Sequence, residues 1–181
     1  VDIAKGEHRK PEYLKLNPNS RVPTLIDGEK VMFEAAAIVL YLVEKHREAK
    51  LAPPPGTPER MLFLQWMAYL TNTLQEAFMQ YFYPEHFATD PKAQENVKAT
   101  AEARLATMWG TIDAALAANG PYLAGKEFTA ADLYLHMLSR WSRSCARTSV
   151  SFPSVKKLVE LVKARPAVQR MMAQERIDEP L

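Results

Sequence analysis

The sequence has little of several features that define whole classes of protein. It contains a single cysteine, Cys145, which excludes an internal disulfide framework and predicts a reducing, cytoplasmic location. Its formal net charge is only +2, from 23 basic and 21 acidic residues, so no nucleic acid is expected as a partner. The longest uninterrupted apolar run, residues 35–43, is far too short to span a bilayer, so no membrane is expected either.

Metal-ligand patterns are also missing. Only four histidines are present, and neither His86 nor His136 belongs to a cluster with metal-ligand spacing, so we expect no metal site. The residues that are present are 48% hydrophobic and 24% charged, which is typical of a globular protein and too apolar for a disordered chain.

The chain changes character at one place. The sequence Ala52-Pro53-Pro54-Pro55-Gly56-Thr57-Pro58 cannot continue a helix, because proline removes a backbone donor and clashes with the preceding turn. We therefore expect a domain at residues 1–49, a linker at 50–58 and a second domain at 59–181.

The second domain is predicted to be entirely helical. Asp90-Pro91 indicates a capped helix start, and Thr129 with Asp132 has the spacing of a capping box. Apolar residues recur every fourth position through the first of these helices, which predicts one continuous buried stripe: Leu62, Trp66, Leu70, Leu74, Phe78 and Phe82.

The first domain has a mixed pattern. The predicted elements are a short helix at 11–16, strands at 22–26 and 31–33 joined by an Asp27-Gly28 turn, and a helix at 34–46. Two strands with a helix on each side cannot close a stable core. We therefore expect a further strand and helix, roughly thirty residues, to precede Val1 in the native protein.

Several short motifs, in this order, resemble the soluble glutathione transferase family. Residues 17–25, Asn-Pro-Asn-Ser-Arg-Val-Pro-Thr-Leu, are similar to the glutathione-binding motif of that family, and Asp27-Gly28 and Phe33-Glu34 continue the pattern. Residues 128–133 resemble its helix-capping motif, and Arg165-Pro166 its last helix boundary. The resemblance implies an α+β, mostly α fold: a partial thioredoxin-like domain followed by an all-helical domain.

The resemblance also implies a site for glutathione, an acidic tripeptide. Val22 would offer its backbone N–H and C=O as a strand edge, with Pro23 in the cis form. Glu34 would take the ligand's ammonium, and the helix start at Ala35 its γ-glutamyl carboxylate. Family members usually have serine where this chain has Ala35, so one hydroxyl is lost and glutathione binding is expected to be weaker or compensated.

Other residues are implied with less support from the pattern. His8 and Arg21 are expected to face the glycyl carboxylate, although a solvated basic loop is an equal alternative for His8. Tyr81 is the expected contact for a hydrophobic second substrate, although most aromatic residues of that stripe are expected in the core. Cys145 is expected to be a partly buried small residue and not a nucleophile.

The resemblance places the residue that activates the thiol, a serine, tyrosine or cysteine, before Val1, so the catalytic residue is unknown. The implied function is conjugation of the glutathione thiolate to hydrophobic electrophiles by a cytoplasmic homodimer. Two alternatives stay open. One is a non-catalytic binding or scaffold module on the same fold, and the other is a glutathione-dependent thiol-disulfide oxidoreductase.

Overall fold

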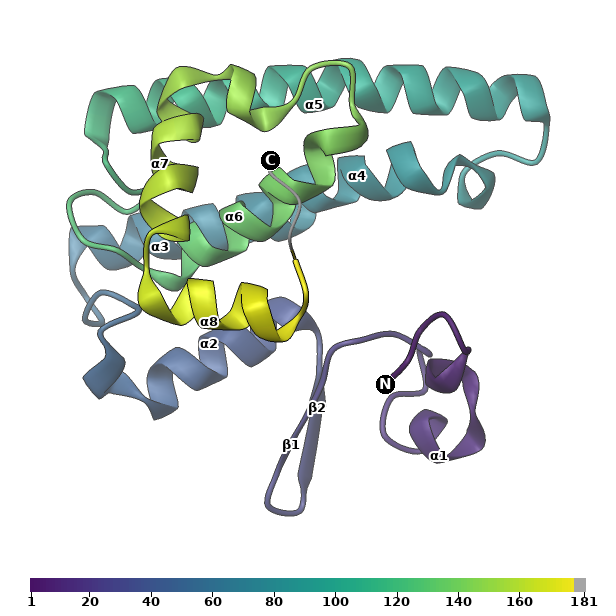
Figure 1. The fold of residues 1–181 in the computed structure, drawn as a ribbon, viewed down its shortest axis with the longest axis horizontal. Coiled ribbons are helices and arrows are strands. Elements are labelled where there is room, and N and C mark those ends of the chain that lie inside the picture. The colour runs from purple at the N-terminus through teal and green to yellow at the C-terminus, as the bar shows by residue number, and fades with distance from the viewer. Residues whose placement is uncertain (178–181) are drawn as a thin grey trace. The chain divides into compact units, whose positions relative to one another are not determined.

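The structure, a computed structural model, describes residues 1–177 and divides the chain into two compact units. The first unit is Val1–Lys50 and the second begins at Leu51. Figure 1 shows the hairpin and short helices of the first unit in purple to blue, and the helices of the second unit through to yellow. None of the described helices is long and apolar enough to cross a membrane.

The first unit contains the predicted order of a helix, two strands and a helix. Its elements are η1 (Glu7–Arg9), α1 (Pro11–Leu14), β1 (Thr24–Asp27), β2 (Lys30–Phe33), α2 (Ala35–Lys45) and η2 (Arg47–Ala49).

The two strands form an antiparallel hairpin. Asp27 pairs with Lys30, so the turn consists of Gly28 and one further residue, and Gly28 has the left-handed φ of 60° that a tight hairpin turn requires. The first strand begins at Thr24 and not at Val22 as predicted, since Pro23 has no N–H to donate to a ladder.

The second unit is built from helices, with an isolated β-bridge between Tyr122 and Gly125 in the loop after Asn119. Its elements are α3 (Pro58–Tyr69), the π-helix η3 (Leu70–Leu74), α4 (Gln75–Phe82), η4 (Pro84–His86), α5 (Pro91–Asn119), α6 (Ala130–Trp141), η5 (Ser142–Ser144), η6 (Ser149–Ser151), α7 (Pro153–Lys163) and α8 (Pro166–Gln174). Helix α5 packs against α4 and α7, and α6 packs against α7 (Figure 1).

The predicted apolar stripe is real, but it crosses a π-helix. Residues four apart drift by about 40° per step around a regular α-helix, so a long stripe at this spacing leaves the buried face. The wide turn of η3 absorbs part of that drift and keeps Trp66, Leu70, Leu74 and Phe78 buried. Phe82, the last member, is 38% exposed, and its neighbour Tyr81 is buried instead.

Both predicted helix starts in this unit are confirmed. The Asp90 carboxylate accepts a hydrogen bond from the Ala93 amide at 2.9 Å. The Asp132 carboxylate accepts one from the Thr129 amide at 2.7 Å and another from the Leu123 amide at 2.9 Å. Burial raises the pKa of Asp132 to about 6, against the lowering effect of these hydrogen bonds.

Candidate functional site

The hairpin register arranges four of the predicted site residues at one end of the sheet. The last pair of the ladder at its open end is Thr24 with Phe33. Strand β2 leads from this pair directly into α2, and β1 leads back to the Asn-Pro motif. Val22 and Pro23 directly precede this pair in the sequence, and Glu34 and Ala35 directly follow it, so all four residues flank the same end of the hairpin.

Val22 has an accessible backbone at this end. The Val22–Pro23 peptide bond is cis, as the motif predicted. Val22 is 43% exposed. Within residues 1–177, neither its N–H nor its C=O has a hydrogen-bond partner. An exposed residue next to a strand with a free donor and a free acceptor is suited to pairing with an extended peptide.

Glu34 has an unusual backbone conformation. Its φ is 73° and its ψ is 107°, a combination that a residue with a side chain rarely adopts and that costs of the order of 1–3 kcal/mol. Its side chain is exposed and makes no capping hydrogen bond to α2. Such strained residues cluster at ligand sites, where the surrounding structure holds them in place.

The start of α2 is open to an anion. The Ile38 amide donates to the Glu34 carbonyl at 3.0 Å, so the amides of residues 35–37 precede the first intrahelical bond. These amides carry the positive end of the helix dipole, which favours a carboxylate. Ala35 is half-buried at the first helical position and adds no polar group of its own.

The two predicted basic contacts differ in their surroundings. Arg21 is exposed and directly precedes Val22. His8 is half-buried, and its carbonyl accepts a hydrogen bond from the Ser20 hydroxyl at 2.9 Å, which ties His8 to the motif loop. The Nδ1 atom of His8 is buried and has no hydrogen-bond partner among the described residues.

Sequence reasoning missed two residues that hold the motif loop. The Tyr13 hydroxyl and the Asn17 amide both donate to the carbonyl of Arg21, at 2.6 and 2.7 Å. Asn17 belongs to the motif at residues 17–25, but the motif alone predicted no structural role for its side chain. Their four-residue separation, which runs from α1 into the turn after it, was the available signal.

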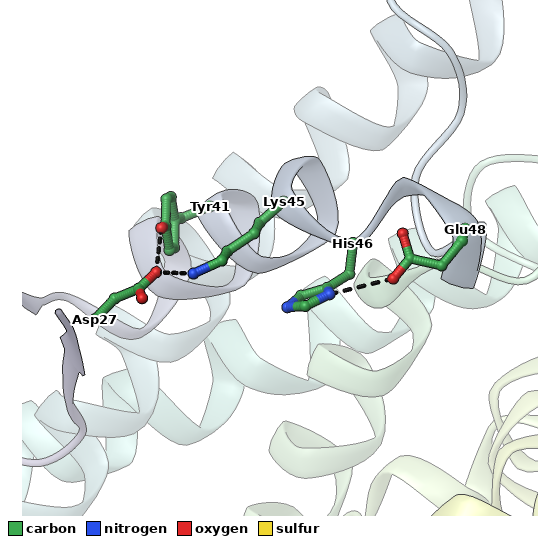
Figure 2. Close-up of polar contacts among 5 residues, drawn as sticks. All are labelled: Asp27, Tyr41, Lys45, His46 and Glu48. Atoms are coloured by element: carbon green, nitrogen blue, oxygen red, sulfur yellow. Dashed lines mark hydrogen bonds and ion pairs between the residues drawn. The ribbon is translucent and has the colours of Figure 1, made fainter.

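A polar group joins the hairpin to α2 (Figure 2). The Asp27 carboxylate at the end of β1 contacts both the Tyr41 hydroxyl and the Lys45 ammonium, each from α2. These hydrogen bonds, from Lys45 first and then Tyr41, lower the pKa of Asp27, and Asp27 raises the pKa of Lys45. The contact fixes the far end of the hairpin on the same helix whose first turn carries the candidate site. Nearby, His46 Nδ1 lies 3.2 Å from a Glu48 carboxylate oxygen.

Tyr81 lies in the helical unit and is only 7% exposed. Its hydroxyl donates to the Ser144 carbonyl at 2.7 Å, and the Lys98 ammonium lies 4.9 Å from the centre of its ring. Beside it, Cys145 is buried, and burial raises the pKa of its thiol to about 11. Tyr81 is therefore buried, while its aromatic neighbours Phe82, Tyr83 and Phe87 are exposed. The buried thiol of Cys145, with its raised pKa, is a poor nucleophile.

Family comparisons cover most of the chain. The family model described as glutathione S-transferase, N-terminal domain, matches residues 1–44. The model described as glutathione S-transferase, C-terminal domain, matches residues 72–175. The second match alone exceeds half of the 181 residues.

Solved structures of similar proteins agree with these matches. A glutathione transferase homologue from Sulfitobacter, with bound glutathione, is 25% identical with a TM-score of 0.87, covering 97% of this chain and 84% of that one. A glutathione transferase from Methylococcus capsulatus is 29% identical with a TM-score of 0.83, covering 98% and 85%. A sphingomonad glutathione S-transferase complexed with glutathione is 26% identical with a TM-score of 0.83, also covering 98% and 85%.

Proposed function

This chain belongs to the glutathione S-transferase family, and we propose that it binds glutathione beside Val22 and transfers the glutathione thiolate to hydrophobic electrophiles. The observation that carries the proposal is the free main chain of exposed Val22, which lies just before β1 at the end of the hairpin where β2 leads into the strained Glu34. Two of the similar proteins, from Sulfitobacter and a sphingomonad, were crystallised with glutathione, which supports this ligand.

Each part of glutathione has a proposed partner in the first unit. The tripeptide backbone pairs with the N–H and C=O of Val22 as a short added strand. The γ-glutamyl ammonium contacts the Glu34 carboxylate, and the γ-glutamyl carboxylate accepts from the amides at the start of α2. His8 and Arg21 provide positive or donor groups for the glycyl carboxylate.

The proposed reaction is a nucleophilic substitution. The thiol loses its proton to solvent, and the sulfur lone pair forms a C–S bond with the electrophilic carbon. The bond from that carbon to its leaving group breaks, so with an aryl chloride the products are a thioether, chloride and a proton. The electrophile is proposed to lie against aromatic side chains near the end of α4, where Tyr81 supports the surface and Tyr83 is 45% exposed. No residue of this sequence is proposed as the thiol-activating group.

A non-catalytic binding module is the second candidate, and Ala35 favours it. Serine at this position would add a hydrogen bond to the ligand carboxylate, and a hydrogen bond to a charged group contributes about 1.5–3 kcal/mol. A thiol-disulfide exchange activity has no support from Cys145, because its thiol is buried and has a raised pKa.

Binding and turnover separate these functions. We expect S-methylglutathione, which needs no thiol activation, to bind the purified protein in isothermal titration calorimetry. We expect glutathione and chlorodinitrobenzene to give the coloured thioether at a rate proportional to protein concentration. Binding without turnover would support the binding module, and no binding of either ligand would contradict both candidates.

The proposal includes a cytoplasmic homodimer, as the family resemblance implies, with a role in detoxification. Sedimentation velocity at micromolar concentration is expected to give the mass of two chains, and the mass of one chain would contradict this part.

A further inference from the structure

Two buried side chains converge on one carbonyl beside the candidate site. The Tyr13 hydroxyl lies 2.6 Å from the Arg21 oxygen, and the Asn17 Nδ2 atom lies 2.7 Å from the same oxygen. Tyr13 is 8% exposed and Asn17 is 2% exposed, so water competes little with either hydrogen bond. Arg21 itself is exposed, so the two donors anchor a loop residue to the interior of the first unit.

The surrounding hydrogen bonds show which atom donates in the contacts of Asn17, Tyr13 and Thr24. The Asn17 Oδ1 atom accepts from the Asn19 amide at 3.1 Å, which leaves its NH₂ group facing Arg21. Tyr13 uses its only proton for Arg21, so the Thr24 hydroxyl, 2.7 Å away, donates to the Tyr13 oxygen. The network therefore holds the chain by hydrogen bonds on both sides of the Val22–Pro23 bond, at Arg21 and at Thr24.

Because the peptide group is planar, fixing the Arg21 carbonyl also fixes the direction of the Val22 N–H. The Arg21 carbonyl and the Val22 N–H belong to one rigid peptide group. The cis bonds among the described residues are Val22–Pro23 and Gly120–Pro121, so the Arg21–Val22 peptide is trans and its N–H points opposite to its C=O. With the C=O held against Tyr13 and Asn17, the N–H must point away from them.

We propose that Tyr13 and Asn17 are positioning residues that clamp the Arg21 carbonyl and so aim the Val22 N–H at the backbone carbonyl of an extended peptide ligand. The inference rests on the proposed function for the identity of that ligand, glutathione. Fixing the donor before the ligand arrives removes an ordering cost from binding, so the clamp acts on ligand affinity.

The primary test is Tyr13→Phe, which removes one hydroxyl and keeps the ring. Loss of one of two hydrogen bonds to the Arg21 carbonyl is expected to raise the Kd for S-methylglutathione roughly 3- to 10-fold. The matched control is Tyr134→Phe in the helical unit, where the hydroxyl donates to Gln75 at 2.6 Å and the residue is 6% exposed. This control is expected to lower the unfolding midpoint similarly and to leave the Kd within about twofold.

A second variant and a ligand-free measurement complete the test. Asn17→Asp keeps an acceptor oxygen for the Asn19 amide and replaces the NH₂ donor with a second oxygen. Because that oxygen would face the Arg21 carbonyl without a proton to donate, this variant is expected to raise the Kd more than Tyr13→Phe does. In the unliganded protein, Tyr13→Phe is expected to move the Arg21 ¹³C carbonyl and Val22 ¹⁵N resonances, and this holds even if the Asn17 variant does not fold.

The outcomes distinguish the two proposals. If the wild-type protein does not bind S-methylglutathione, the proposed function fails and the binding role of the clamp fails with it. If the wild type binds, and Tyr13→Phe has the wild-type Kd and unchanged Arg21 and Val22 resonances, the clamp is wrong and the proposed function stands. Equal losses of affinity in Tyr13→Phe and Tyr134→Phe would also contradict the clamp.

Discussion

At the scale of single residues, Ala35 is the most informative position of the candidate site. It follows the strained Glu34 and is the first residue of α2, so its backbone amide is available to an anion while its methyl group adds no hydrogen bond. A serine here would place a hydroxyl beside the same amides. The candidate site therefore lacks one hydroxyl group, and a substitution at Ala35 can test what that hydroxyl would contribute.

We expect Ala35→Ser to tighten the binding of S-methylglutathione by about tenfold or more, because it adds a hydrogen bond to the ligand's charged carboxylate. Calorimetric titration measures the change. Ala36→Ser, one residue further into the same helix, is the matched control and should leave the Kd near the wild-type value. If Ala36→Ser also tightened ligand binding tenfold, the gain would come from any hydroxyl near the helix start and not from position 35.

At the scale of elements, the start of α7 is capped by a side chain from another helix, α5. Helix α7 begins after Phe152, which cannot cap it through a side chain. The Asp113 carboxylate of α5 provides the acceptor instead, at 2.6 Å from the Ser154 amide and 3.1 Å from the Val155 amide. This one side chain joins α5 to α7 and neutralises the positive end of the α7 dipole.

Replacing this cap should therefore destabilise the protein. We expect Asp113→Ala to lower the free energy of unfolding by about 1–2 kcal/mol, the usual range for a lost N-cap. Urea denaturation followed by circular dichroism measures the shift. Asp113→Asn keeps an oxygen acceptor and loses only the charge, so it should retain part of the stability; an Asn variant as unstable as the Ala variant would argue against the hydrogen-bond explanation.

At the scale of the whole molecule, two buried titrating groups on α6 have opposite effects on stability. Burial first, and then the charges of Arg140 on α6 and Lys163 on α7, lower the pKa of His136 from 6.5 to about 4. Neither ring nitrogen of His136 has a hydrogen-bond partner in the part of the chain that the structure describes. Asp132, one turn earlier, has a pKa raised from 3.8 to about 6 by burial.

The direction in which each group changes stability with pH depends on whether the folded or the unfolded state binds the proton first. Between about pH 6.5 and 4 the unfolded chain binds a proton at His136 and the folded protein does not, so His136 lowers the stability as pH falls. Between about pH 6 and 3.8 the folded protein binds a proton at Asp132 first, so Asp132 raises the stability as pH falls. The two pKa shifts have similar size, and each corresponds to roughly 3 kcal/mol, so the two effects largely offset each other.

We therefore expect the combined contribution of His136 and Asp132 to the stability of the wild-type protein to change little between about pH 6 and 4. His136→Phe should gain stability relative to wild type as pH falls through this window, and Asp132→Asn should lose it. Denaturant titrations at half-unit pH intervals measure both slopes. Parallel profiles for wild type and His136→Phe would show that His136 does not titrate in this range.

The sequence alone determined the features whose cause is local. A proline-rich break, an Asp90-Pro91 helix start, the Thr129 and Asp132 capping box and a glycine turn each depend on a few adjacent residues and their backbone preferences. The motif at residues 17–25 indicated the region of the proposed glutathione site because its residues are consecutive. The cis form of Val22–Pro23 followed from the resemblance and was confirmed.

Only the tertiary structure decided the features that depend on contacts between elements. The burial of Tyr81 involves a hydrogen bond to Ser144, 63 positions away, and the capping of α7 by Asp113 joins residues about forty positions apart. The positive φ of Glu34 occurs where β2 joins α2, and the clamp on Arg21 needs Tyr13 of α1 to lie beside the motif loop. No periodicity or propensity encodes these contacts, because their energy comes from the geometry of groups that meet only after folding.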